Sequence, residues 1–131
     1  MNISQAAEQS GLSKKTIRYY ESIDLVNPAS RETNGYRVYG QRQIKELRFV
    51  YQSRELGFTL DECRDLLSLY NNTSRKSSVV KAMTIDKIAD IDLKISKLEN
   101  IRTSLAELAE DCHGNDRAEC PILDGLAGLP R

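Results

Sequence analysis

The fold is decided by residues 11–21, which read Gly11-Leu12-Ser13-Lys14-Lys15-Thr16-Ile17-Arg18-Tyr19-Tyr20-Glu21. Gly11 breaks a short helix that Ser4 can cap, and Ser13 is a typical N-cap for a second helix ending at about Glu21. A helix, a tight turn and a second helix predict a helix-turn-helix over residues 4–21. A short helical hairpin inside a bundle is the alternative that these residues leave open.

The second predicted helix has two chemically different faces. We expect Ile17 and the aromatic pair Tyr19 and Tyr20 to point inward. The opposite face offers cations to solvent from Lys14, Lys15 and Arg18. Such a face is suited to a polyanion.

A small wing is predicted next, over residues 31–39. Its centre is Asn34-Gly35, a pair that favours the positive φ angles of a tight hairpin turn. Around that turn, Arg31, Tyr36 and Arg37 could hold phosphates, because the guanidinium fork matches phosphate oxygens. A plain surface loop is the alternative.

Two more helices complete the predicted head, residues 1–70. The first runs from about Gln41 to Glu55 on a regular apolar stripe. Thr59 and Glu62 form a capping box that begins the second. Cys63 lies on the apolar stripe of that helix, so we interpret it as a core residue and not a ligand. The polar residues that follow indicate a hinge over 71–79.

A long helix is predicted over residues 80–110. Its apolar positions recur at steps of three and four residues, at Ile88, Ile91, Ile95, Leu98, Ile101, Leu105 and Leu108. The helix would be roughly 45 Å long, more than so small a head can cover. The seam therefore predicts dimerisation through a coiled coil, with packing against the head as the alternative.

The segment 111–131 contains a loop bounded by two thiols, Cys112 and Cys120. Gly114 and the polar residues between them allow both sulfurs to meet. Thiolates prefer soft metals, and zinc requires three or four protein ligands, whereas only His113 is a further nitrogen donor nearby. A monovalent ion therefore fits best. Chance cysteines or a reversible disulfide remain alternatives, and no third group orients the cysteine and histidine for catalysis.

Composition bounds the class of protein. The chain has 131 residues, 40% of them hydrophobic, and no net charge, which is typical of one folded domain. Residues 14–54 carry nine Lys and Arg against four acids, whereas residues 61–131 carry ten against thirteen. A basic segment followed by a neutral-to-acidic one suggests a first half that binds a polyanion and a second half with another role. No signal peptide or apolar run of about 20 residues is evident, so we expect a cytoplasmic location without a membrane partner.

The chain resembles the MerR-type transcriptional regulators over nearly its whole length. The resemblance rests on residues 11–13, 16–21, 34–39 and 54–60, in that order and spacing. It implies a winged-helix head that binds double-stranded, palindromic promoter DNA as a homodimer, in the presence of RNA polymerase. It also implies DNA contacts from Lys15, Arg18, Tyr20, Arg31, Tyr36, Arg37 and Arg54, with Arg18 in the major groove.

The same resemblance implies a sensing mechanism. The long helix would pair antiparallel across the dimer, and Cys112 and Cys120 occupy the metal-ligand positions. Sensors of divalent metals carry a cysteine at the position of Ser77. A serine there resembles the copper-efflux subtype, so the effector would be Cu(I), or Ag(I) or Au(I). Metal would distort the promoter and activate transcription, without enzymatic activity. His113 departs from the pattern, and no cysteine-rich end follows.

Three alternatives remain from the residues themselves. The same architecture could sense Zn(II) with His113 as an extra ligand, Ag(I), Au(I) or thiol oxidation. A helical interaction module without DNA binding is a different class, which the basic segment and the wing argue against. An enzyme has the least support.

Overall fold

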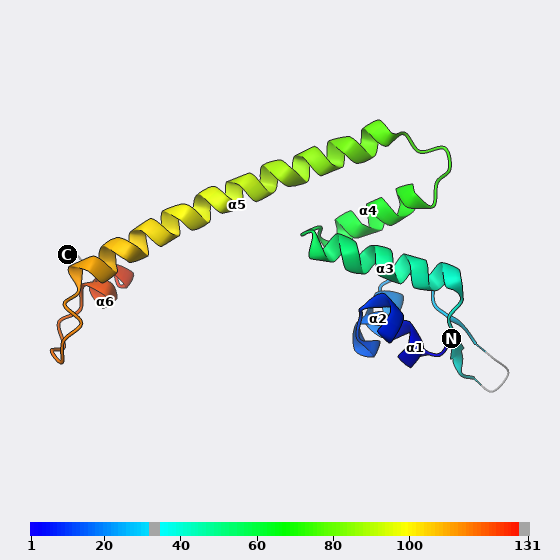
Figure 1. Cartoon of the computed structure of the whole chain (residues 1–131), viewed down its shortest axis with the longest axis horizontal. Coiled ribbons are helices and arrows are strands. Elements are labelled where there is room, and N and C mark those ends of the chain that lie inside the picture. Colours follow the sequence, from blue (N-terminus) through cyan, green and yellow to red (C-terminus); the bar gives the residue numbers. More distant parts are fainter. Residues whose placement is uncertain (32–34, 129–131) are drawn as a thin grey trace. The chain divides into compact units, whose positions relative to one another are not determined.

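The structure of the protein is a computed structural model that describes residues 1–31 and 35–128 (Figure 1). It is mainly helical, as predicted, and divides into two compact units, Met1–Thr84 and Ile85–Arg131. Along the chain its elements are α1 (Ile3–Ser10), α2 (Lys14–Ser22), β1 (Ser30–Arg31), β2 (Arg37–Val38), α3 (Gln41–Glu55), α4 (Leu60–Tyr70), α5 (Ser77–Asp111) and α6 (Pro121–Leu126). The predicted turn residue Asn34 and the last three residues of the tail lie outside the described residues.

The helix-turn-helix is formed by α1 and α2, and its caps are local. The side chain of Ser13 accepts a hydrogen bond from the Thr16 N–H at 3.1 Å, as expected of an N-cap. The cap of α1 differs from the prediction, because Asn2 and Gln5 bond each other reciprocally and take the place expected for Ser4. Between the helices, Gly11 has a φ of 85°, and a Cβ there would lie 3.2 Å from the ring of Tyr51. Glycine therefore fits both the turn and the close packing.

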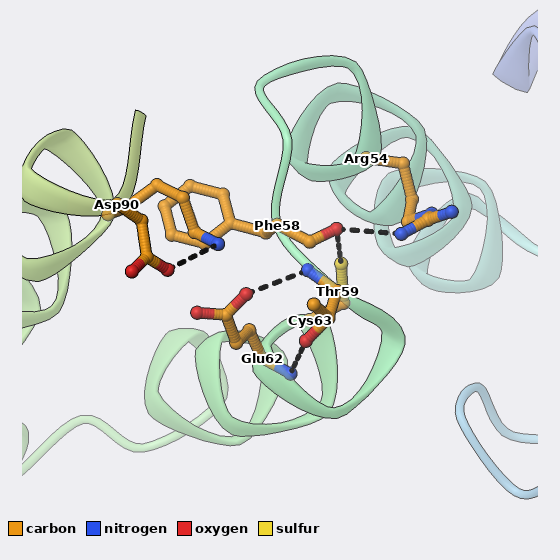
Figure 2. Close-up of polar contacts among 7 residues, drawn as sticks. Arg54, Phe58, Thr59, Glu62, Cys63 and Asp90 are labelled. Atoms are coloured by element: carbon orange, nitrogen blue, oxygen red, sulfur yellow. Dashed lines mark hydrogen bonds and ion pairs between the residues drawn. The ribbon is translucent and has the colours of Figure 1, made fainter. Parts of the chain in front are cut away.

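The helices α3 and α4 have the predicted starts. At the start of α4, the Thr59 N–H donates to Glu62 at 2.8 Å and the Glu62 N–H donates to Thr59 at 3.2 Å (Figure 2). The cap aims the apolar stripe of α4 inward, and Cys63 is completely buried. Its prediction as a core residue is confirmed.

The first unit has a continuous apolar core. The buried hydrophobic residues are Ala6, Ile17, Tyr20, Leu25, Val26, Ala29, Tyr39, Ile44, Leu47, Val50, Phe58, Cys63, Leu66 and Leu67. They come from the short helices α1 to α4 and the segments between them. Each large aliphatic side chain buried in this way stabilises the fold by about 1.5–3 kcal/mol, so the head is held by a core contained in one chain.

The turn after α2 is held by α4. The guanidinium of Arg64 donates to the carbonyl oxygens of Ile23 and Asp24, at 3.0 and 2.8 Å. Asp24 has a positive φ, a conformation unusual for a residue with a side chain. These two hydrogen bonds fix the end of α2, and β1 and β2 follow as an antiparallel pair in which Arg31 faces Arg37.

The helix α5 starts earlier than predicted, at Ser77, because it includes the end of the expected hinge. Its apolar seam is largely exposed in the single chain, from 38% at Ile91 to 64% at Leu98. Lys87 is buried within α5, with Nζ 3.7 Å from Asp90 Oδ2. Within the described residues, no helix combines the length and apolarity that a bilayer-spanning segment needs.

The short helix α6 has no counterpart among the predicted elements. It packs on the end of α5 through Gly125, where an added Cβ would lie only 2.5 Å from a Leu108 methyl carbon. Pro121 occupies the first position of α6, where its missing N–H and fixed φ are favourable. The loop between Cys112 and Cys120 is thereby closed by two helix ends.

Candidate nucleic-acid interface and metal centre

One groove of the first unit brings together residues from the predicted helix and wing. Arg18 of α2 and Tyr36 and Arg37 of the wing line a space of about 690 Å³, together with residues of the N-terminal segment 1–5. Tyr36 is 72% exposed. Guanidinium and phenol groups facing one groove are suited to phosphate and sugar oxygens.

Three of the other predicted contact residues lie at the surface of the same unit. Lys15 is exposed on α2. Arg31 is exposed and donates to the Gly35 carbonyl oxygen at 3.0 Å, which holds its guanidinium against the wing. Arg54 is exposed near the end of α3 and donates to the Phe58 carbonyl oxygen at 2.9 Å (Figure 2). All three cations are therefore accessible at their predicted positions, and Arg31 and Arg54 are also held by the backbone.

The two adjacent tyrosines of α2 require a correction. The prediction that both point inward is wrong, because Tyr19 is 51% exposed and only Tyr20 is buried, at 6%. Consecutive positions on a helix are about 100° apart, so the two rings diverge. Tyr20 has little exposed surface for a DNA contact, so we do not assign it one. Tyr19 is an exposed candidate that the sequence pattern missed.

A buried polar network joins α2 to the wing, and no signal in the sequence indicates it. Glu21 accepts a hydrogen bond from the Tyr39 hydroxyl at 2.5 Å and forms an ion pair with Arg37 at 2.9 Å. Burial, together with the bond to Glu21, raises the pKa of Tyr39 above its usual value. Tyr39 therefore stays protonated and remains a hydrogen-bond donor at neutral pH.

The two loop cysteines lie at helix ends. Cys112 follows α5 directly, and Cys120 is the residue before α6; both are half-buried and unbridged. The thiol of Cys120 makes no full capping hydrogen bond, but the backbone N–H groups of Leu123 and Ile122 favour its charged form. A hydrogen bond from the Cys112 thiol also favours the charged form. These three groups together lower the pKa of Cys120. The structure thus brings the two predicted thiols together, and the pKa of Cys120 lies below its usual value.

The donor set of this loop is small. His113 is exposed and lines a pocket of about 370 Å³ that Cys120 also lines. Among residues 1–31 and 35–128, no three or more His, Cys, Asp or Glu side chains are grouped as a metal site. The two thiols are soft donors. Ser77 is the exposed first residue of α5 and belongs to the other unit, so its part in selectivity stays a prediction.

Comparison with protein families gives two overlapping matches. Residues 1–69 match the family described as MerR HTH family regulatory protein, and residues 44–108 match the one described as MerR, DNA binding. The matches include the helix-turn-helix, the wing and most of α5.

Individual proteins are similar over almost the whole chain. The HTH-type transcriptional regulator CueR of Salmonella typhimurium is 47% identical over 128 residues, covering 98% of this chain and 93% of that protein. Heavy metal-dependent transcription regulator 1 of Rhizobium meliloti is 48% identical over 128 residues, covering 97% and 87%. Among solved structures, the regulator PbrR691 from Ralstonia metallidurans CH34 in complex with lead(II) has a TM-score of 0.82 at 28% identity, covering 96% and 98%.

Proposed function

The chain belongs to the MerR family of transcriptional regulators, and on that premise we propose that it is a metal-responsive activator of transcription. It binds palindromic promoter DNA as a homodimer, beside RNA polymerase. A monovalent soft ion, Cu(I) in the first place, binds Cys112 and Cys120 and causes the dimer to distort the promoter.

The observation that carries the choice of effector is the paired thiols at the ends of α5 and α6. Both are partly accessible, and Cys120 has a lowered pKa. Two thiolates are a complete ligand set for a monovalent soft ion, whereas a zinc site would need further donors. The heavy-metal dependence in the name of the Rhizobium meliloti relative supports metal sensing.

On the DNA side, we assign direct contacts to exposed cations of the head. Arg18 and Lys15 lie on α2, which enters the major groove, and Arg31 and Tyr36 of the wing hold the backbone. Arg54 adds a contact near the end of α3. Because these cations displace counterions from phosphates, binding weakens steeply as salt rises. Arg18→Ala reduces promoter affinity and leaves metal stoichiometry unchanged.

Dimerisation is assigned to the exposed seam of α5. From Ile88 to Leu105, its isoleucine and leucine side chains at helical spacing are 38–64% exposed in one chain. Such a row is suited to an antiparallel copy of the same helix. Pairing two chains in this way also supplies the twofold symmetry that a palindromic site requires.

The coupling rests on the loop between the two helix ends. Cys112 and Cys120 would hold the ion, and its positive charge would favour the arrangement of the loop in which the two sulfurs lie together. The N–H groups of Ile122 and Leu123 offset the negative charge of the thiolates, and Gly125 keeps α6 against α5. Metal and distorted DNA must favour each other by the same factor, so metal binds more tightly to the dimer on distorted promoter DNA than on straight DNA.

The test is an anaerobic titration of the reduced protein with Cu(I) against a competing chelator, with a parallel Zn(II) series and X-ray absorption. We expect one ion per loop, two sulfur ligands and negligible competition by zinc. Cys112→Ser and Cys120→Ser abolish tight Cu(I) binding and keep promoter binding, and His113→Ala changes neither. A zinc site with three or four ligands, His113 among them, would contradict the assigned effector.

Promoter binding is measured separately by gel shift. Failure of the reduced protein to retard any duplex selected from a random-sequence library would contradict the DNA-binding part and favour an interaction module. Metal-dependent transcription in vitro then tests activation, and both cysteine variants should lose it.

A further inference from the structure

Glu21 is a buried acid on α2 with both carboxylate oxygens engaged. The residue is 7% exposed, Oε1 accepts the Tyr39 hydroxyl at 2.5 Å, and Oε2 lies 2.9 Å from Nη1 of Arg37. Arg37 belongs to β2 of the wing, and Tyr39, which follows β2, is only 2% exposed. One side chain of the helix thus holds two points of the wing.

The physical chemistry makes this contact demanding. A buried carboxylate is costly unless it is both paired and hydrogen-bonded, and removing one partner leaves the other without compensation. One hydrogen bond, from Tyr39, and one ion pair, with Arg37, hold the wing against α2 at two points. Arg37, 27% exposed at its side chain, has its charge neutralised by this pairing. Its guanidinium therefore serves the wing more than a phosphate.

We propose that Glu21 is a positioning residue, which locks the wing against α2 through Arg37 and Tyr39 and so raises DNA affinity without touching DNA. The proposal rests on the proposed DNA-binding function of the head. It also revises the part of Arg37, from a direct phosphate contact to a partner in this lock.

The sign of one substitution separates this role from simple electrostatics. Glu21→Gln removes a negative charge from a unit that binds a polyanion, so charge alone predicts tighter binding. Loss of the lock predicts weaker binding. Glu8→Gln is the matched control, because Glu8 is exposed on α1 and the change in net charge is the same.

The experiment uses the full-length protein and a duplex selected from a random-sequence library by the wild type. At fixed salt, we expect Glu21→Gln to bind this duplex about tenfold more weakly, the loss that corresponds to one strong hydrogen bond to a charged group. Glu8→Gln should bind as tightly as the wild type or more tightly. Hydroxyl-radical footprints of Arg31→Ala identify the wing-dependent protection, and Glu21→Gln should lose protection at the same sugars while keeping the rest.

Folding is checked by circular dichroism and thermal unfolding. If Glu21→Gln does not fold, Tyr39→Phe, which removes only the hydroxyl of the lock, decides the question by the same footprint. A folded variant that matches Glu8→Gln in affinity and keeps the full footprint would overturn the lock while the proposed function stands. If the wild type selects no duplex, the proposed function and the lock both fail.

Discussion

The head and the segment from Ile85 onward use apolar side chains in opposite ways. In the described part of the head, fourteen hydrophobic residues are buried within one chain. In α5, the seam residues from Ile88 to Leu105 remain 38–64% exposed, and the residue buried in that helix is a lysine. The head buries its apolar core within one chain, whereas the long helix leaves its apolar seam exposed. The contrast teaches that exposed apolar residues at regular helical spacing are best interpreted as one half of a contact.

The strongest way to test the self-contained head is to remove core volume. Leu47 is 1% exposed. Leu47→Ala should therefore lower the free energy of unfolding by about 2–5 kcal/mol, because the cavity cannot be refilled easily. Leu56 is 66% exposed, and Leu56→Ala is the control, which should lose no more than about 0.5 kcal/mol. Urea unfolding of both variants measures the difference, and equal losses would contradict a core contained in the head.

The second prediction concerns the seam. Leu98→Asp should weaken dimerisation by about 3 kcal/mol, roughly a hundredfold, because it replaces apolar burial by a charge. Leu93→Asp changes the same residue type, 71% exposed but off the seam, and should leave the dimer intact. Sedimentation equilibrium distinguishes them. Equal behaviour of the two variants would show that the seam is not the interface.

A third prediction addresses the local packing in the second unit. A methyl group on Gly125 would meet Leu108, push α6 away and separate the thiols. Gly125→Ala should therefore weaken Cu(I) binding roughly tenfold, or by about 1.4 kcal/mol. The double variant Gly125→Ala with Leu108→Ala should recover affinity, since the clash is removed. Chelator competition measures both, and no loss in the single variant would mean that the loop positions its thiols independently of α6.

The smallest effect is a pH dependence of the head. The pKa of Tyr39 is raised above its ordinary 10.0 by burial and by Glu21, so the folded state keeps this proton to higher pH than the unfolded state. Protonated Tyr39 therefore contributes its full share of the free energy of unfolding below the pKa of the unfolded state. That share is lost as pH rises through the pKa of the folded state. Tyr39→Phe should cost about 1 kcal/mol at neutral pH, and its difference from wild type should shrink as the pH rises above 10.0. A constant difference in urea unfolding would contradict this linkage.

Local signals predict much of the fold. Three signals are each local to one helix: the Ser13 cap of α2, the apolar stripe of α3, and the capping box of Thr59 and Glu62 at the start of α4. The structure has these elements at those positions. The cap of α1 is harder to place because Ser4 and Asn2 are both good caps, and the reciprocal bonds with Gln5 favour Asn2.

Features that depend on distant pairs are not predictable in the same way. Glu21 and Tyr39 are 18 residues apart, and nothing in either neighbourhood indicates that they share a hydrogen bond. The helix α6 is too short for a periodic signal, and Pro121 is equally typical of the exit from a loop. The spacing of Cys112 and Cys120 does predict that their thiols can meet, because a flexible loop with few residues brings its ends together at low entropic cost.

The complete burial of Cys63 makes its rate of thiol labelling a measure of core opening. A thiol reagent reaches a buried sulfur only when the surrounding core opens, whereas Cys112 and Cys120 are partly accessible in the native state. The native chain should therefore titrate two thiols quickly and the third at the rate of core opening. A single labelling trace would then report the state of the loop in its first phase and the integrity of the head in its last.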